Sequence, residues 1–373
     1  MAGQKTSHFL AALTTPGSLR PLDGLRAIAI LLVLSMHIAL RIPGIFATDW
    51  AKPFLHGWIG VDLFFVLSGY LVGGSVLRTL AEKRFSFRKF YLRRSFRILP
   101  AYFAVLIAIC IIRYGFPRIG GVPSFHLKDL VPNILLLTDY WQGNIGAPSW
   151  SLSIEEHFYL LVPVLLFGVR NSQPATRRNV LVGIVVLALA GRMLTYYLYD
   201  LGGSFPSQDI LPLIYYPFHS RMDSLAMGVL IALVHQESPG VMPAFVRSVA
   251  AMLGLLIIGM MYFTGALSGR WVKVTLEYTL LAAGFGTILW SVIPTDPITR
   301  LGRILSYGFW VPIARLSYSL YLTHLIVLAF MGDAKGNRIL APVIMLACCF
   351  AVALPLFFLV EEPLHRYARR RFK

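Results

Sequence analysis

Residues 22–40 read LDGLRAIAILLVLSMHIAL, an apolar stretch whose charged groups, Asp23 and Arg26, lie near its beginning. At about 1.5 Å per residue, a helix of this length reaches nearly across a hydrocarbon core of about 30 Å. Comparable stretches recur along the chain of 373 residues, in which 57% of positions are apolar and only 14% are charged. Soluble proteins average about 25% charged residues. The pattern predicts an all-α integral membrane protein and excludes most soluble folds.

Apolar runs bounded by charge, proline and glycine clusters predict about ten transmembrane helices in one compact bundle. With the amino terminus in the cytoplasm, the cytoplasmic segments hold 21 of the 34 Lys and Arg residues and the outer segments hold 9. This asymmetry follows the positive-inside rule. We therefore expect both termini in the cytoplasm and a single domain over residues 1–373, with short tails at 1–20 and 361–373. The predicted spans are Leu22–Leu40, Trp58–Leu80, Ile98–Phe116, Ser149–Val169, Asn179–Tyr199, Leu213–Val234, Arg247–Gly265, Thr275–Ile293, Pro312–Met331 and Pro342–Val360.

The formal net charge of +17 is an orientation signal in a membrane chain, so we expect no nucleic-acid partner. The three cysteines lie in apolar runs and provide neither a disulfide framework nor a metal site. Positive charge is densest between the second and third spans. This cluster either anchors the topology against anionic lipid or forms a cytoplasmic anion site. Its members are Lys83, Arg84, Arg88, Lys89, Arg93, Arg94 and Arg97.

Ionisable residues inside the predicted spans are functional candidates, because each is costly in hydrocarbon and needs a partner or a cavity. Counting residues from the span ends places them between the midplane and the outer surface, with His37, Asp62 and Glu155 in the outer half. The full set is His37, Asp62, Glu155, Glu156, His157, His219, Arg221, Asp223 and His324.

Structural roles are the alternative for most of this set. His157, His219 and His324 are each suited to hydrogen bonding between helices, and Asp62 to the solvated start of a helix. Arg221 and Asp223 suit a structural ion pair, but residues at i and i+2 do not face each other, so each needs a partner elsewhere. His37 has the stronger functional claim, because imidazole is the side chain best suited to proton transfer near neutral pH.

Seven motifs in a fixed order together resemble the membrane-bound acyltransferase-3 family of sugar O-acyltransferases. They are PLDGLRAIAILLVLSMHI at 21–38, GWIGVDLFFVLSGYLVGG from Gly57, FYLRRSFRILPAYF from Phe90, SWSLSIEEHFYLLVPVLL from Ser149, RMDSLAMGVL from Arg221, LSYSLYLTHL from Leu316 and VEEPLHRYARRRF at 360–372. The resemblance implies transfer of an acyl group, most often acetyl, from cytoplasmic acyl-coenzyme A to a hydroxyl of a carbohydrate or lipid-linked glycan. It also implies a multi-pass protein of the bacterial inner membrane, with acyl-coenzyme A as a substrate and no tightly bound cofactor.

The family's signature of an Arg followed by ten residues and a His is matched by Arg26 and His37. Its basic element is matched by Arg93, Arg94 and Arg97, which we expect to hold the phosphates of the donor together with Arg26. Many relatives carry a further extracytoplasmic hydrolase-like domain. Because this sequence continues for thirteen residues after Val360, we expect a stand-alone version.

The acidic pair of the family is matched by Glu155 and Glu156. For the reaction we expect His37 to act as the general base, with Asp62 or Glu155 holding its other ring nitrogen. Direct transfer and an acyl-histidine intermediate remain open at this stage. The candidate donors to the oxyanion are Arg221, Tyr318 and Ser317, and His324 completes the catalytic set.

Other classes of function also fit this sequence. Polar residues within ten helices suit a secondary transporter or a flippase of a lipid-linked glycan. An O-acyltransferase acting on a macrolide-type small molecule is a further alternative. The intact spacing of Arg26 and His37 argues against an inactive relative.

Overall fold

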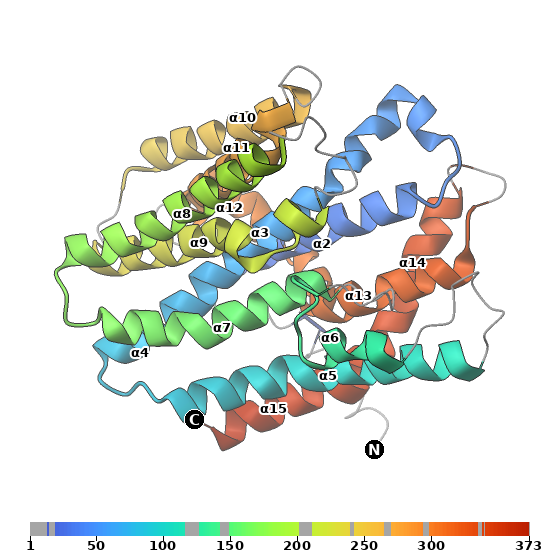
Figure 1. Ribbon diagram of the computed structural model, residues 1–373, viewed down its shortest axis with the longest axis horizontal. Helices are drawn as coiled ribbons and strands as arrows, with labels where there is room; N and C mark the ends of the chain where they lie inside the picture. The colour runs from blue at the N-terminus through green and yellow to red at the C-terminus, as the bar shows by residue number, and fades with distance from the viewer. Residues whose placement is uncertain are drawn as a thin grey trace.

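The computed structural model describes residues 13–14, 19–115, 127–141, 149–200, 211–238, 242–264, 270–293, 298–334, 338 and 340–372. Within these ranges every regular element is a helix and no strand occurs (Figure 1). The α-helices are α2 (Arg20–Ala39), α3 (Ile59–Ser68), α4 (Gly74–Ala81), α5 (Phe87–Gly115), α6 (Val131–Ile134), α7 (Trp150–Gly168), α8 (Pro174–Asp200), α9 (Phe218–Glu237), α10 (Ala244–Thr264), α11 (Arg270–Val292), α12 (Arg300–Leu305), α13 (Trp310–Met331), α14 (Leu340–Leu356) and α15 (Glu362–Arg371). Short 3₁₀ segments are η1 (Ile45–Ala47), η2 (Asp49–Trp58) and η5 (Leu127–Leu130), and π-helical turns are η3 (Gly69–Gly73), η7 (Leu211–Tyr215) and η8 (Phe357–Glu361).

Nine helical segments among the described residues are long and apolar enough to cross a membrane. The predicted class, an all-α multi-pass membrane protein, is confirmed. The predicted sixth span corresponds to α9, a 20-residue helix that is not among the nine because its first turns are polar. The count of ten and the cytoplasmic position of both termini stay predictions.

Helices extend beyond the predicted spans at two basic segments of the chain. The third span was expected from Ile98, but α5 begins at Phe87, so Arg93, Arg94 and Arg97 lie on a helix rather than in a loop. The expected tail 361–373 is helical through α15. Arg and Lys are good helix formers, and the two basic helices lie side by side at the end of the bundle where the carboxyl terminus is marked (Figure 1).

Helix α9 packs so closely on α3 and η3 that only glycine fits at the contact. A Cβ on Gly69 would lie 2.0 Å from the Leu225 carbonyl oxygen, and one on Gly228 would lie 2.1 Å from that of Val66. Small residues of this kind let helix backbones approach in membrane proteins. The close contact places the start of α9, with Arg221, directly against Asp62 of α3.

The described part of the segment between α5 and α7, residues 127–141, packs on both helices. Asn133 of α6 is fully buried; its carbonyl oxygen accepts from the Tyr102 hydroxyl at 2.9 Å and its side-chain oxygen accepts from the Ser149 hydroxyl at 3.0 Å. Residues 131–138 thus form a short helix followed by turns. The other residues between the predicted third and fourth spans, 117–126 and 142–148, lie outside the described residues.

Candidate active site

Two histidines meet where α2 packs against α13, one near the carboxyl-terminal end of α2 and the other on α13. The rings of His37 and His324 lie with centroids 4.9 Å apart in an edge-on arrangement. His324 is fully buried, whereas His37 is partly exposed. Both were candidates from the sequence, and the structure brings them together as neighbours.

The backbone sets the tautomer of both rings. His37 Nδ1 donates to the Val33 carbonyl oxygen at 2.9 Å, and His324 Nδ1 donates to the Tyr321 carbonyl oxygen at 2.7 Å. A carbonyl oxygen only accepts, so Nδ1 carries the hydrogen and, in the neutral ring, Nε2 holds a free lone pair. Nε2 of His324 is buried and has no hydrogen-bond partner among the described residues. The site therefore contains two adjacent proton acceptors.

The carboxylates predicted to orient His37 have other partners. Glu155 accepts from the Ser68 hydroxyl at 2.8 Å and from the Tyr159 hydroxyl at 2.7 Å. Asp62 is paired with Arg221 at 2.5 Å. One of these carboxylates was expected to accept from a ring nitrogen of His37. The Val33 carbonyl oxygen accepts from Nδ1 instead, because a histidine in a helix can reach the carbonyl four residues before it.

Glu155 belongs to a second group, built around arginines from α2 and α5. Arg26 and Arg94 both lie within electrostatic range of Arg97 and of Glu155. The Arg94 guanidinium also lies 5.5 Å from the centre of the Tyr159 ring. We call Arg26, Arg94 and Arg97 the arginine group. Glu155, predicted as a possible partner of His37, is bound by Ser68 and Tyr159 and lies within electrostatic range of the arginine group.

Arg93 differs from the other two arginines of its motif. Its Nε donates to the Phe372 carbonyl oxygen at 2.7 Å, and its Nη2 donates to the same oxygen. These bonds cap the last turn of α15 and hold it against α5. The structure thus gives Arg93 a helix-anchoring contact, and Arg97 lies nearer the interior, within electrostatic range of Arg26 and Glu361.

Polar side chains occupy the space between the arginine group and the histidine pair. Tyr321 lies with its ring centre 5.7 Å from that of His324, shares a hydrogen bond with the Ser151 hydroxyl, and is within electrostatic range of Glu155. Beside Glu155, the Tyr318 hydroxyl donates to the Ile98 carbonyl oxygen at 2.8 Å. Tyr318 and Tyr321 of α13 therefore place polar groups between the two predicted parts of the site.

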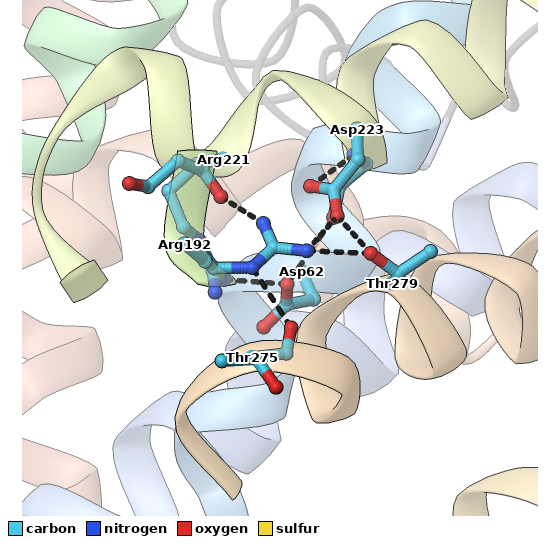
Figure 2. A network of polar contacts seen from close by, with 8 residues as sticks. Asp62, Arg192, Arg221, Asp223, Thr275 and Thr279 are labelled. Atoms are coloured by element: carbon cyan, nitrogen blue, oxygen red, sulfur yellow. Dashed lines mark hydrogen bonds and ion pairs between the residues drawn. The ribbon is translucent and has the colours of Figure 1, made fainter. Parts of the chain in front are cut away.

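A second, fully buried network surrounds Arg221 and Asp223 (Figure 2). Arg221 pairs with Asp62, and its guanidinium lies 4.2 Å from the centre of the Tyr278 ring. Asp223 pairs with Arg192 at 2.7 Å. Each member of the i, i+2 pair thus has its partner on another helix, as predicted. None of the four charged side chains is exposed.

Arg192 is the residue of this network that the sequence interpretation missed. Besides Asp223, it donates to the Thr275 carbonyl oxygen at 2.9 Å, to the Ser220 carbonyl and to the Thr279 hydroxyl (Figure 2). A single arginine within the apolar run of α8 was the available signal, because a charge at that depth requires partners.

Two of the three predicted oxyanion donors are engaged in these contacts. Arg221 is bound to Asp62 in the buried network, and Tyr318 is bound to the Ile98 carbonyl. Ser317 is buried on α13, and Glu156 has a buried Oε1 with no hydrogen bond to the described residues. Arg221 and Tyr318 are therefore occupied by contacts within the protein, whereas Nε2 of His324 has no hydrogen-bond partner among the described residues.

Comparisons with known proteins agree with this arrangement. A family model described as an acyltransferase domain matches residues 20–362. Peptidoglycan O-acetyltransferase OatA of Listeria monocytogenes is 28% identical, over 92% of this chain and 55% of that protein. Putative peptidoglycan O-acetyltransferase YrhL of Bacillus subtilis is 28% identical, over 94% and 55%, and a putative O-acetyltransferase of Staphylococcus aureus is 25% identical, over 83% and 50%. No solved structure matches the chain.

The chain spans about half the length of the curated relatives it matches. The family match covers nearly the whole chain and includes every helix that contributes to the histidine pair and the arginine group. The motifs, the helical membrane architecture and the match agree, and the chain belongs to the acyltransferase-3 family.

Proposed function

We propose that this protein is a membrane-embedded O-acyltransferase that takes an acyl group, most simply acetyl, from acyl-coenzyme A at the cytoplasmic face. The acceptor is a hydroxyl of a carbohydrate or lipid-linked glycan at the opposite face of a bacterial inner membrane. One observation carries the proposal: Arg26 of the arginine group and His37 of the histidine pair lie eleven residues apart on one helix, and Tyr321 lies near both His324 and Glu155. The named activities of the relatives support it.

The arginine group suits the phosphates of the donor. Guanidinium groups bind phosphate through a planar fork of donors, and Arg26, Arg94 and Arg97 approach one another despite their like charges. An anionic ligand between them would offset that repulsion. Glu155 supplies part of the compensation in the free protein, within range of Arg26 and Arg94.

The spacing of the two groups suits the length of the donor. Arg26 and His37 lie on one helix, eleven residues apart, which is roughly 16 Å at 1.5 Å per residue. The pantetheine arm of coenzyme A extends from the phosphates to the thioester. With the phosphates at the arginine group, the arm would follow the polar residues Tyr321 and Ser151 toward His37.

At the histidine pair the free lone pair of His37 Nε2 is the proton acceptor. It takes the proton of the acceptor hydroxyl as that oxygen attacks the thioester carbonyl. The carbon–sulfur bond then breaks, the ester forms, and the coenzyme A thiolate leaves and takes up a proton. A positioned general base contributes roughly 10²–10⁴-fold to such a step.

Sealed, oriented vesicles test the proposal. Labelled acyl-coenzyme A is supplied only on the side that carries the amino terminus, and a glycan acceptor is supplied only on the other side. Labelled ester on the acceptor is expected. A transporter or flippase would move the acceptor unmodified, and an enzyme of one face would give product only when donor and acceptor share a side. Either result contradicts the proposal.

A further inference from the structure

Helix α15 lies against the first half of α5 and brings further cations to the arginine group (Figure 1). Arg93 Nε donates to the Phe372 carbonyl oxygen at 2.7 Å, and the centre of the Phe96 ring lies 5.6 Å from that of the Tyr367 ring. Later positions of α5 thus meet earlier positions of α15, so the two helices are antiparallel. Arg97, one turn after Arg93, therefore faces the first turns of α15.

The side chains of α15 within electrostatic range of Arg97 are His365 and Arg369. Residues at i and i+4 lie on the same face of a helix. Arg315 of α13 is within range of both, and Arg94 is within range of His365. Four guanidinium groups therefore surround one imidazole. We call Arg315, His365 and Arg369 the α13–α15 basic group; it adjoins the arginine group at Arg97.

The carboxylates beside these cations already have partners. Glu361 accepts from the Ser319 hydroxyl at 2.6 Å and is within electrostatic range of the arginine group. Glu362 is within range of Arg369, but Arg366 donates to it at 3.1 Å. One carboxylate thus serves two arginines, and positive charge remains in excess in the α13–α15 basic group. Because like charges repel, an anion that binds among them is stabilised.

The α13–α15 basic group is accessible to a ligand. Arg369 is exposed in the last turn of α15, and Arg315 and His365 are partly exposed. Arg97 joins this group to the arginine group, whose member on α2 is eleven residues from His37. A ligand that extends from the histidine pair through the arginine group therefore reaches the α13–α15 basic group next.

The donor of the proposed reaction carries two separate phosphate elements. A diphosphate joins pantetheine to adenosine, and a phosphate monoester is attached to the 3′ oxygen of the ribose. A phosphate monoester carries about 1.5 to 2 negative charges at pH 7 and presents three acceptor oxygens. With the thioester at His37 and the diphosphate at the arginine group, the monoester lies on the side of the α13–α15 basic group.

We propose that the α13–α15 basic group binds the 3′-phosphate of acyl-coenzyme A. Arg315 and Arg369 pair with its oxygens through their guanidinium forks, and His365 donates a further hydrogen bond. The inference rests on the proposed function, because it assigns a second part of the donor. It adds that the enzyme distinguishes donors by the phosphate on the ribose.

The test compares two probes, coenzyme A and 3′-dephospho-coenzyme A, which differ only in the phosphate monoester. The substitution is Arg369→Gln. Its matched control is Arg370→Gln, which removes the same charge from an exposed position of the same turn, about 100° away around the helix. Binding is measured by titration calorimetry on the full chain in nonionic detergent. Both variants should keep the wild-type thermal unfolding temperature, because both side chains are exposed.

Wild-type protein should bind coenzyme A about tenfold or more tightly than the dephospho probe. Arg369→Gln should lower this ratio about threefold to tenfold by weakening the binding of coenzyme A alone, and Arg370→Gln should leave the ratio within about twofold. Equal binding of both probes to the wild type, equal weakening of both by Arg369→Gln, or an equal change of the ratio in Arg370→Gln overturns the inference. Each of these results leaves the proposed function standing, whereas a wild-type protein that binds neither probe contradicts the proposed donor as well.

Phosphate is also the chemistry of anionic lipid headgroups. The titrations are therefore repeated with phosphatidylglycerol in the micelles. If the basic group holds the phosphate of the donor, the wild-type ratio of the two probes should stay within about twofold of its value without lipid. A ratio that disappears when the lipid is present assigns the group to the lipid headgroup and overturns the proposal.

Discussion

Removal of the Asp223 carboxylate should destabilise the protein strongly, because it leaves the Arg192 charge buried. Both side chains are fully inaccessible, and Asp223 is the charged partner of a guanidinium whose other contacts are two carbonyls and a hydroxyl. Removal of one partner of a buried ion pair lowers the free energy of unfolding by about 3–5 kcal/mol. Asp223→Ala also removes the acceptors of the Ser224 backbone N–H and the Thr279 hydroxyl, so we expect the upper part of this range.

Thermal unfolding of the purified protein in detergent measures the loss. At about 2–4 °C per kcal/mol, Asp223→Ala should lower the unfolding temperature on the order of 10 °C. The double variant Arg192→Leu with Asp223→Leu removes both charges and should recover most of the stability. A single variant within about 2 °C of the wild type, or a double variant that loses the sum of both single losses, would refute the reasoning about this pair.

Three further outcomes follow from the other contacts. His37→Ala should lower the acyl-transfer rate about 10²–10⁴-fold with normal expression and membrane insertion, and retention of more than about a tenth of the rate contradicts its role as the base. Arg97→Ala should raise the KM for acyl-coenzyme A, and its difference from the wild type should shrink at high salt because screening weakens the contribution of the Arg97 charge. Arg93→Ala should instead lower thermal stability through the lost contact with Phe372; equal KM effects of the two substitutions would contradict this division. Gly228→Ala should destabilise the protein, because its Cβ would lie 2.1 Å from the Val66 carbonyl oxygen, and an unchanged unfolding temperature would show that α9 can shift.

Distances along one helix were predictable from the sequence. Because α2 is one continuous helix, the separation of Arg26 and His37 follows from the count of residues between them. The requirement for external partners of Arg221 and Asp223 was predictable in the same way, from helical geometry alone. The identity of those partners was not predictable, because Asp62 and Arg192 lie on other helices. The helical repeat of one segment does not specify which helices pack against it.

Residue counts along a predicted span did not identify the neighbours of its side chains. Arg221 was counted from an expected start at Leu213, whereas α9 begins at Phe218. Glu155 was assigned to the layer of His37 by depth, and its side chain accepts hydrogen bonds from Ser68 and Tyr159. The position of a residue along its helix determines its height in the bundle. The rotation of the helix about its own axis decides which neighbours the side chain contacts.

The sequence by itself determined the class of the protein, its membrane-spanning character, its family and the spacing of Arg26 and His37, because apolar length, helical rise and motif order are local properties of the chain. Only the tertiary structure decided that His37 meets His324, that Arg192 neutralises Asp223, and that α15 brings His365 to Arg97. These contacts join residues on different elements. They depend on which helix faces pack together, and that choice is made by the fit of the whole bundle, including the glycine contacts that bring α9 against α3 and η3.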